Sequence, residues 1–363
     1  IKDLNNAICH VPEPALKEMI ASGVKENKLS GSTTYESIPK SDVILVTVGT
    51  PLSEEFDADL AAITDVFRNL SHHISGGQVV MIKSTVPPGV TRKMADEFFN
   101  NRKDIFIGFS PERLAEGVAI QEFRTFPIVV GGINDESTEK CANFWSQTLG
   151  VEVIKVSSCE AAELVKLADN QWIDLNVALA NELAILCDSL PYELDILEII
   201  QGANSLKKGQ HYVNILSPSI GVGGYCLTKD PWFLSSLGEK NGADIKLPSM
   251  GRSVNDMMPS YSADQIFDYF EGINVNIDEV KIAVLGYSFK SNSGDIRFTP
   301  METFIEEIRR RGVKNISVFD STISPNIRKS KRVDWKDNWE ECLNDADCLV
   351  YGAAHEDIAM INM

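Results

Sequence analysis

The sequence lacks the features that mark several classes of protein. No run of about 18 apolar residues occurs, and no basic segment precedes an apolar one, so neither a membrane span nor a signal peptide is predicted. The 7 cysteines are odd in number and form no Cys-x-x-Cys pair, which argues against a zinc ribbon or a disulfide scaffold. This cysteine usage is typical of a reduced, intracellular protein. We therefore expect a cytoplasmic location, and we expect no metal site.

Positive charge is also scarce. The chain has 34 Lys and Arg residues against 52 Asp and Glu residues, which gives a formal net charge of −18. Nonspecific binding of nucleic acid needs a positive surface, so this class is disfavoured. An anionic small molecule would need a local cluster of Lys and Arg. A length of 363 residues favours two or three domains.

A dinucleotide-binding Gly-x-Gly-x-x-Gly motif after a first strand is missing as well. The nearest glycine cluster, 221–224, follows no predicted strand. The strands from Val43 onward nevertheless resemble the third and later strands of a dinucleotide-binding domain. We therefore expect the chain, which starts at Ile1 without a Met, to begin inside its first domain.

Apolar, β-branched runs alternate with helical patterns in the first part of the chain. The predicted strands are 43–48, 78–83, 105–109, 127–131 and 151–156, and the predicted helices between them include 59–70 and 91–100. Nearly continuous apolar strands that alternate with helices indicate a parallel sheet covered on both faces.

A long helix is predicted over 157–190, because apolar residues recur there mostly every three or four positions. At 1.5 Å per residue, such a helix can bridge two domains. A glycine-rich stretch and a further helix over 248–270 follow. The α/β pattern then returns with predicted strands at 280–286, 315–320 (which ends in an acid) and 348–352, and with helices at 301–311 and 335–344. The organisation is therefore an α/β domain, a long helix and a second α/β domain.

Two segments in the middle of the chain carry residue types suited to catalysis. Cys226 follows the 221–224 glycine cluster after one intervening residue, and Asp230 would share a face with Cys226 if a helix starts there. Lys166 and Asn170 form an i,i+4 pair on one face of the long helix, amid apolar residues. The alternatives are a buried structural cysteine after a turn and a solvated lysine.

Three further segments follow strands, where ligands bind in parallel sheets. They are 84–89, 110–117 with Glu112, and 286–300 with Lys290 and Arg297, whose cationic side chains suit phosphate. The respective alternatives are an ordinary turn, an acid that stabilises a helix start, and solvated loop charges.

Taken in order, these motifs resemble the UDP-glucose/GDP-mannose dehydrogenase family over nearly the whole chain. The matching segments are 48–51, 84–89, 111–112, 163–170, 221–230 and 289–290 with Arg297, and the Gly-Gly-x-Cys-x-x-x-Asp element is specific. Segments 176–183, 213–216 and 230–233 are most similar to members that act on UDP-N-acetyl-D-mannosamine. Tyr212 and Tyr225 depart from the Arg and the His that many members have at these positions.

The resemblance implies two Rossmann-like parallel-sheet domains joined by a long central helix. The implied domains are an NAD-binding domain at 1–156 without its glycine-rich part, a helical dimerisation region at 157–270 with the cysteine loop, and a UDP-sugar-binding domain at 271–363 whose last part, with a UDP-binding Arg, is absent. The implied cofactor is NAD, the implied partner is a UDP-sugar, and a homodimer or higher homo-oligomer is expected.

The resemblance also assigns site residues. The implied catalytic residues are Cys226, Lys166, Asp230, Asn170, Glu112 and Thr85. The implied cofactor-binding residues are Thr50, Pro51, Thr85, Glu116 and Arg297. The implied substrate-binding residues are Glu112, Arg113, Lys166, Asn170, Tyr212, Asn214, Gly223, Arg252, Phe289 and Lys290.

The reaction that the resemblance implies is a four-electron oxidation of a sugar C6 alcohol to a carboxylate, through a thiohemiacetal and a thioester on Cys226. UDP-N-acetyl-D-mannosamine is the expected substrate, with UDP-N-acetylglucosamine and UDP-glucose as alternatives. A single-step hydroxyacid or 6-phosphogluconate-like dehydrogenase would not need Cys226. A non-catalytic nucleotide-sugar-binding protein would tolerate the loss of Cys226, Lys166 and Asp230.

Overall fold

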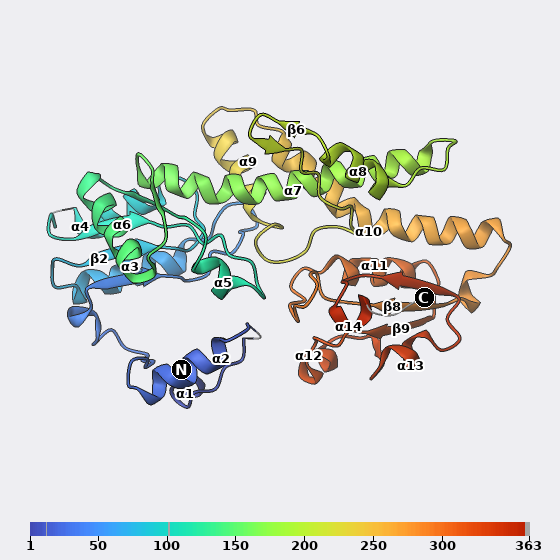
Figure 1. Ribbon diagram of the computed structural model, residues 1–363, viewed down its shortest axis with the longest axis horizontal. Helices are drawn as coiled ribbons and strands as arrows, with labels where there is room; N and C mark the ends of the chain where they lie inside the picture. The colour runs from blue at the N-terminus through green and yellow to red at the C-terminus, as the bar shows by residue number, and fades with distance from the viewer. Residues whose placement is uncertain (12, 101, 360–363) are drawn as a thin grey trace. The chain divides into compact units, whose positions relative to one another are not determined.

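The computed structural model describes residues 1–11, 13–100 and 102–359. These residues form two compact units, which are considered one at a time (Figure 1). Unit 1 contains residues 1–169 and 232–244, and unit 2 contains residues 170–231 and those from 245 onward. The boundary between them falls within one helix, α7 (Cys159–Ser189), whose 31 residues confirm the predicted long helix.

Unit 1 is an α/β unit. Its elements are α1 (Lys2–Asn5), α2 (Leu16–Lys25), the 3-10 helix η1 (Ile38–Lys40), β1 (Val43–Val46), α3 (Ala61–His73), β2 (Val79–Ile82), α4 (Val90–Phe99), β3 (Phe106–Phe109), α5 (Ala119–Phe123), β4 (Ile128–Gly132), α6 (Asp135–Leu149), β5 (Val153–Lys155), the start of α7 and most of α9 (Asp230–Lys240). The predicted strands and helices of this part are all present, with ends that differ by a few residues.

The sheet of unit 1 has the strand order β1-β2-β3-β4-β5. The β1–β2, β2–β3 and β4–β5 pairings are parallel, as expected, whereas β3 and β4 pair antiparallel. The segment between β3 and β4 contains the 5-residue helix α5 in place of the long crossover helix that a parallel connection uses. The expected parallel arrangement therefore fails at this one pairing.

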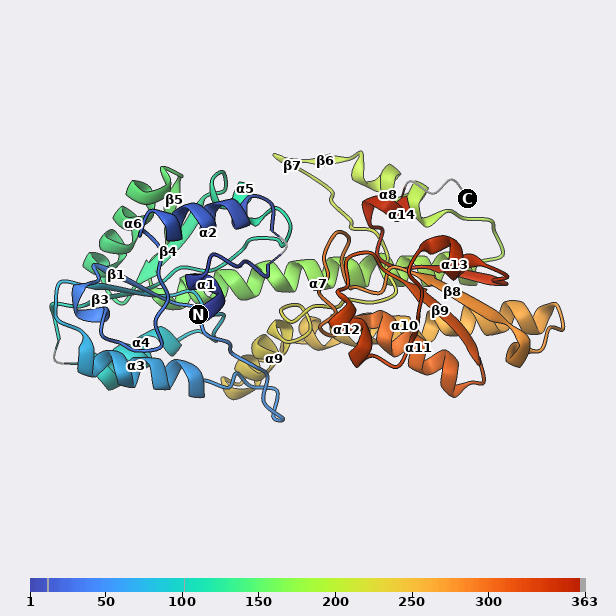
Figure 2. The same cartoon turned by 90° about the horizontal axis from the view of Figure 1, so that it is seen from below.

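Both faces of this sheet are covered, as the continuous apolar strands predict. In β2, Val80 and Ile82 contribute to the core beneath α3 and α4, while Val79 and Met81 contribute to the core beneath α6. Figure 2 shows α3 and α4 on one side of the sheet and α6 on the other. Because successive side chains of a strand point to opposite faces, a strand between two helical layers must be apolar throughout.

Unit 2 contains the second α/β sheet. Its elements are the rest of α7, α8 (Ile196–Asn204), β6 (Lys207–Lys208), β7 (His211–Tyr212), α10 (Leu247–Gly272), the 3-10 helix η2 (Ile277–Glu279), β8 (Lys281–Leu285), α11 (Pro300–Arg310), β9 (Asn315–Phe319), α12 (Pro325–Ser330), β10 (Asp334–Trp335), α13 (Trp339–Leu343), β11 (Cys348–Tyr351) and α14 (Glu356–Ala359). Its main sheet is parallel, with the order β10-β9-β8-β11, and β6 and β7 form a small hairpin.

The central strand β8 is again apolar on both faces. Ile282 and Val284 belong to the core on the α10 and α11 side, and Ala283 and Leu285 belong to the core on the α13 side. The helix predicted over 335–344 is wrong at its start, because 334–335 form β10 and the helix begins at Trp339. Asn338 sets this start, since its side chain accepts a hydrogen bond from the Glu341 N–H at 2.8 Å.

Candidate functional site

The ends of β1 and β2 in unit 1 are tied together by hydroxyl groups. The Thr50 Oγ1 donates a hydrogen bond to the Thr85 carbonyl at 2.7 Å, and the Ser84 Oγ donates to the Val48 carbonyl at 2.6 Å. Thr50 is buried, Thr85 is half-buried and the neighbouring Pro51 is exposed. The structure thus brings Thr50 and Thr85 together at the carboxyl edge of the sheet, which is where nucleotides bind in such folds.

Glu112, just past the end of β3, is held against a lysine that the sequence analysis missed. The half-buried Glu112 carboxylate lies 3.3 Å from the Lys83 Nζ and also accepts the Arg113 N–H at 2.9 Å. The Lys83 Nζ donates to the Ser110 carbonyl at 3.4 Å and lies 5.0 Å from the centre of the Trp145 ring. Burial lowers the pKa of Lys83, and the charge of Glu112 opposes this effect. The signal that could have identified Lys83 is a lysine directly after the fully apolar strand β2.

Arg113 and Glu116 lie beyond Glu112 in the same loop. The Arg113 Nη2 donates to the Pro127 carbonyl at 2.5 Å, and its Nη1 lies 3.8 Å from the Asp169 carboxylate of α7. The Arg113 guanidinium is therefore engaged with the chain itself, while Glu116 is exposed.

The buried residue Glu163 links α7 to the start of α4. Its two carboxylate oxygens accept hydrogen bonds from the Gly89 N–H at 2.6 Å and the Thr91 N–H at 2.7 Å, which are amides at the first turn of α4. The 84–89 loop is thereby fixed to the α7 segment that carries Lys166. Burial raises the pKa of Glu163 to about 7, although the hydrogen bonds from Thr91 and Gly89 oppose this rise.

Glu163→Gln is expected to reduce the pH dependence of stability. Because the folded-state pKa is raised from 4.5 to about 7, the folded protein holds more protons than the unfolded chain between these values. The free energy of unfolding must therefore fall as the pH rises through this window. Between pH 5 and 8 we expect wild type to lose about 2 kcal/mol more than Glu163→Gln in urea unfolding. Glu139→Gln, at an exposed carboxyl, serves as the control, and parallel profiles for wild type and Glu163→Gln would contradict the expectation.

The glycine loop of unit 2 packs tightly against the loop that follows β8. A Cβ on Gly223 would lie 2.5 Å from the Phe289 Cβ, and Gly224 has a φ of +86°. The Gly224 N–H donates to the Arg297 carbonyl at 3.0 Å. Only glycine permits this close approach. The structure therefore brings Gly223, Phe289 and the Arg297 backbone together beside Cys226.

Cys226 is exposed, so the alternative of a buried structural cysteine is wrong. The Asp230 N–H donates to the Cys226 carbonyl at 2.9 Å, and α9 begins at Asp230. The fully buried Asp230 carboxylate accepts a hydrogen bond from the Asn170 Nδ2 at 2.5 Å and lies 2.5 Å from the Nζ of Lys229, which is also buried. Lys229 had no role in the sequence analysis, and the structure shows that its ammonium group pairs with the adjacent Asp230 carboxylate.

Lys166 lies one turn of α7 before Asn170, is half-buried and shares its helix face. Its intermediate exposure differs from that of a fully solvated surface lysine. The predicted pair is thus present, with Asn170 bound to Asp230.

Arg252 is buried on α10 and is 1 % exposed. Its Nη1 lies 2.7 Å from Asp174 on α7, and it also forms an ion pair with Asp256. Burial raises the pKa of Asp174, whereas the Arg252 charge lowers it. Arg252 also lines a cavity of about 440 Å³, together with Val222 and other residues of the glycine loop, α10 and the start of α11.

The other residues of unit 2 that are predicted to bind substrate or cofactor are exposed or half-buried. Tyr212 is 63 % exposed on the β6–β7 hairpin, and Asn214, also exposed, receives a hydrogen bond on its carbonyl from the Asn176 Nδ2 at 2.7 Å. Lys290 is half-buried. The exposed Arg297 guanidinium pairs with Asp295 at 2.5 Å and lies 5.8 Å from the centre of the Tyr225 ring.

The described part of the chain shows neither a metal-binding cluster nor a membrane-spanning helix. Across residues 1–11, 13–100 and 102–359, no group of three or more His, Cys, Asp or Glu side chains is arranged to hold a metal ion. Within the same ranges, no helix combines the length and the apolar character needed to cross a membrane.

Comparison with known proteins shows the family of the chain. Three domain models of the UDP-glucose/GDP-mannose dehydrogenase family match the chain: the NAD-binding domain at residues 1–149, the central domain at 160–257 and the UDP-binding domain at 283–363. The chain is 30% identical to the UDP-N-acetyl-D-mannosamine dehydrogenase of Pyrococcus horikoshii over 100% of this chain and 83% of that protein.

Solved structures agree with this similarity. A structure of the UDP-D-ManNAc dehydrogenase from Pyrococcus horikoshii aligns with a TM-score of 0.88 and 30% identity, covering 99% of this chain and 82% of the other. An NDP-N-acetyl-D-galactosaminuronic acid dehydrogenase from Methanosarcina mazei aligns with a TM-score of 0.83 and 28% identity, covering 100% and 78% of the respective chains.

Proposed function

The chain belongs to the UDP-glucose/GDP-mannose dehydrogenase family of NAD-dependent enzymes, and on this premise we propose that it oxidises the C6 alcohol of UDP-N-acetyl-D-mannosamine to the carboxylate. The observation that carries the chemical part of the proposal is the exposed Cys226, which follows a tightly packed glycine loop and is hydrogen-bonded to the start of α9 at Asp230. The sugar is proposed from the names of the relatives at 30% identity.

The described residues of unit 1 fit NAD. The hydroxyl-linked ends of β1 and β2, at Thr50 and Thr85, form the kind of strand edge at which a dinucleotide binds. We propose that the cofactor-binding residues are Thr50, Pro51, Thr85, Glu116 and Arg297. When bound, NAD⁺ supplies the acceptor for hydride.

The first oxidation requires removal of the C6 hydroxyl proton as hydride leaves the carbon. We propose that Lys166, or a water activated by Asp230, accepts this proton. The Cys226 sulfur then bonds to the aldehyde carbon, and its proton passes to the carbonyl oxygen, which gives a thiohemiacetal. This covalent step retains the reactive aldehyde.

The second oxidation removes hydride from the thiohemiacetal carbon and a proton from its hydroxyl group, which leaves a thioester on Cys226. Water then cleaves the carbon–sulfur bond, releasing the carboxylate and restoring the thiol. We propose that Asp230, Glu112 and Thr85 position or activate this water, and that Lys166 and Asn170 stabilise the oxyanion as fixed donors.

We also propose which residues bind the nucleotide sugar. The residues concerned are Glu112, Arg113, Lys166, Asn170, Tyr212, Asn214, Gly223, Arg252, Phe289 and Lys290. The packing of Gly223 against Phe289 supports the part of this set that lies in unit 2. We propose that residues 1–156, 157–270 and 271–363 are the three functional domains of the chain.

A substrate panel tests this function. The full chain would be incubated with NAD⁺ and UDP-N-acetylmannosamine, UDP-N-acetylglucosamine, UDP-N-acetylgalactosamine or UDP-glucose, with NADH followed by absorbance and products by mass spectrometry. We expect the highest kcat/KM for UDP-N-acetylmannosamine and two NADH per sugar acid. A higher kcat/KM for another sugar would overturn the assigned substrate, one NADH per product would indicate a simple alcohol dehydrogenase, and binding without turnover would indicate a non-catalytic protein.

We also propose that the protein forms a homodimer through α7. Trp172, Leu179 and Leu186 recur every seven residues, so they lie on one helix face, and they are 50%, 46% and 51% exposed. Such an apolar stripe is typical of a protein–protein interface. Light scattering should give twice the chain mass, and the pair Leu179→Asp and Leu186→Asp should yield a monomer. A wild-type monomer would exclude this interface.

A further inference from the structure

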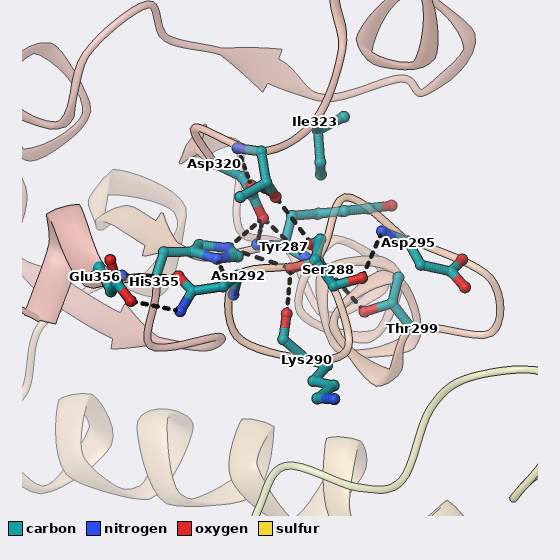
Figure 3. A network of polar contacts seen from close by, with 12 residues as sticks. Tyr287, Ser288, Lys290, Asn292, Asp295, Thr299, Asp320, Ile323, His355 and Glu356 are labelled. Carbon is teal, nitrogen blue, oxygen red and sulfur yellow. Dashed lines mark hydrogen bonds and ion pairs between the residues drawn. The ribbon is translucent and has the colours of Figure 1, made fainter. Parts of the chain in front are cut away.

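The loop between β8 and α11 in unit 2 is held by a buried polar network centred on Asp320 and His355 (Figure 3). Asp320 is the acid that ends the second strand of this sheet, and in a dinucleotide-binding domain an acid at this position binds a ribose hydroxyl. Neither the proposed catalytic steps nor the proposed binding residues include Asp320 or His355, so their role needs a separate explanation.

Both oxygens of Asp320 are used by the protein itself. Its Oδ2 accepts the N–H groups of Tyr287 and Ser288 at 2.8 and 2.9 Å and lies 3.0 Å from the His355 Nε2. Its Oδ1 accepts the Thr322 N–H at 2.9 Å and the Thr322 hydroxyl at 2.6 Å. The side chain is 0% exposed. Asp320 is therefore placed to bind backbone rather than a ribose.

The charge state of Asp320 suits this role. Burial by itself would raise the pKa of Asp320, but hydrogen bonds from His355 and Thr322 and from the Ser288 N–H together outweigh it and hold that pKa well below the usual carboxyl range. The residue is thus a carboxylate with acceptors for all of these donors.

His355 connects Asp320 to the middle of the loop. Its Nδ1 accepts the Asn292 N–H at 2.9 Å, so in the neutral ring the proton is assigned to Nε2, which donates to Asp320. The ring is 1 % exposed. Figure 3 shows His355 between Asp320 and Asn292, with the Lys290 side chain extending away from the ring.

Further hydrogen bonds fix the remainder of the loop. The Ser288 hydroxyl donates to the Lys290 carbonyl at 3.1 Å, and the Thr299 hydroxyl donates to the Tyr287 carbonyl at 2.7 Å. The loop is therefore fixed at its beginning, its middle and its end. Between these points it presents Phe289 to the glycine loop that precedes Cys226.

We infer that Asp320 and His355 are positioning residues, which hold the 286–299 loop in the conformation that places Phe289 and Lys290 for the nucleotide sugar. This inference rests on the proposed function. On this inference, Asp320 binds the 286–299 loop instead of a ligand. The tautomer of His355 then affects substrate binding, because it decides which ring nitrogen accepts the Asn292 N–H.

His355→Ala tests the inference, because it removes the ring that accepts the Asn292 N–H and that contacts Asp320 and the Ser288 hydroxyl. We expect the KM for the UDP-sugar and the Kd for UDP to rise about tenfold, with kcat changed much less and the KM for NAD⁺ unchanged. His355→Asn retains an acceptor near Asn292, and His355→Gln retains a donor toward Asp320. Each should therefore restore part of the affinity that His355→Ala loses.

The matched control is Cys342→Ala, at a fully buried site on the α13 side of the same sheet. It should lower Tm without changing the KM for the UDP-sugar, which separates loss of stability from loss of positioning. If His355→Ala does not fold, the Asn and Gln variants decide the matter. Unchanged UDP affinity in the folded His355 variants would overturn the inference alone, whereas a wild type that binds no UDP by calorimetry would overturn the proposed function and the inference with it.

Discussion

Cys226→Ser is expected to abolish formation of the sugar acid, with a loss of about 10³-fold or more in the rate of uronate production. Serine keeps the size and the exposure of the side chain, but its hydroxyl is a far weaker nucleophile than a thiol. The thiohemiacetal would not form, and no thioester could follow. The measurement is the yield of uronate by mass spectrometry beside the yield of NADH.

Cys348→Ser is the matched control for this experiment. Cys348 is a free thiol of intermediate exposure in β11 of the same unit, and it lies outside the glycine loop. It should retain wild-type activity. A Cys226→Ser enzyme that still forms the acid at the wild-type rate would rule out the thioester mechanism while leaving the family assignment intact.

Asp230→Asn is expected to lower kcat by about 10²- to 10⁴-fold, the usual contribution of a general acid–base group. The buried carboxylate accepts the Asn170 amide and neutralises Lys229. Asparagine has nearly the same shape, but it cannot activate water and it removes the carboxylate charge beside the Lys229 ammonium group. We expect a loss of stability in the same variant, because removing one partner of a buried ion pair is costly.

The two effects can be separated by adding Lys229→Met to Asp230→Asn. Removal of the Lys229 charge as well should restore most of the thermal stability but none of the kcat. Asp278→Asn, at a surface carboxylate paired with Lys314, should change neither quantity appreciably. Recovery of kcat in the double variant would show that Asp230 acts only through stability.

Several features of the molecule could be predicted from local patterns. The apolar strands β2 and β8 and the 31-residue helix α7 follow directly from residue periodicity. The family could be recognised because the glycines, Cys226 and Asp230 lie within one ten-residue segment, 221–230. Their spacing can be read from the sequence without knowledge of the fold.

Other features could not be predicted because they depend on residues far apart in sequence. The antiparallel β3–β4 pairing depends on the path of the 110–127 segment. Lys83 is paired with Glu112, and Glu163 is bound to the first turn of α4. The hydrogen-bond donors around a carboxylate determine what it can do, and the spacing of residues in the sequence does not specify these donors.

The sequence by itself determined the α/β class, the long central helix, the family and the identity of the cysteine loop, because hydrophobic periodicity and short motifs are local properties. Only the tertiary structure decided that Cys226 is exposed, that Asp230 is buried between Asn170 and Lys229, and that Asp320 binds a loop through His355. Burial and hydrogen-bond partners arise from the packing of segments separated by 35 or more residues in these cases, such as Asp320 with His355 and Asn170 with Asp230. The buried lysines Lys83 and Lys229 are each held by a carboxylate, and these ion pairs are likewise seen only in the folded structure.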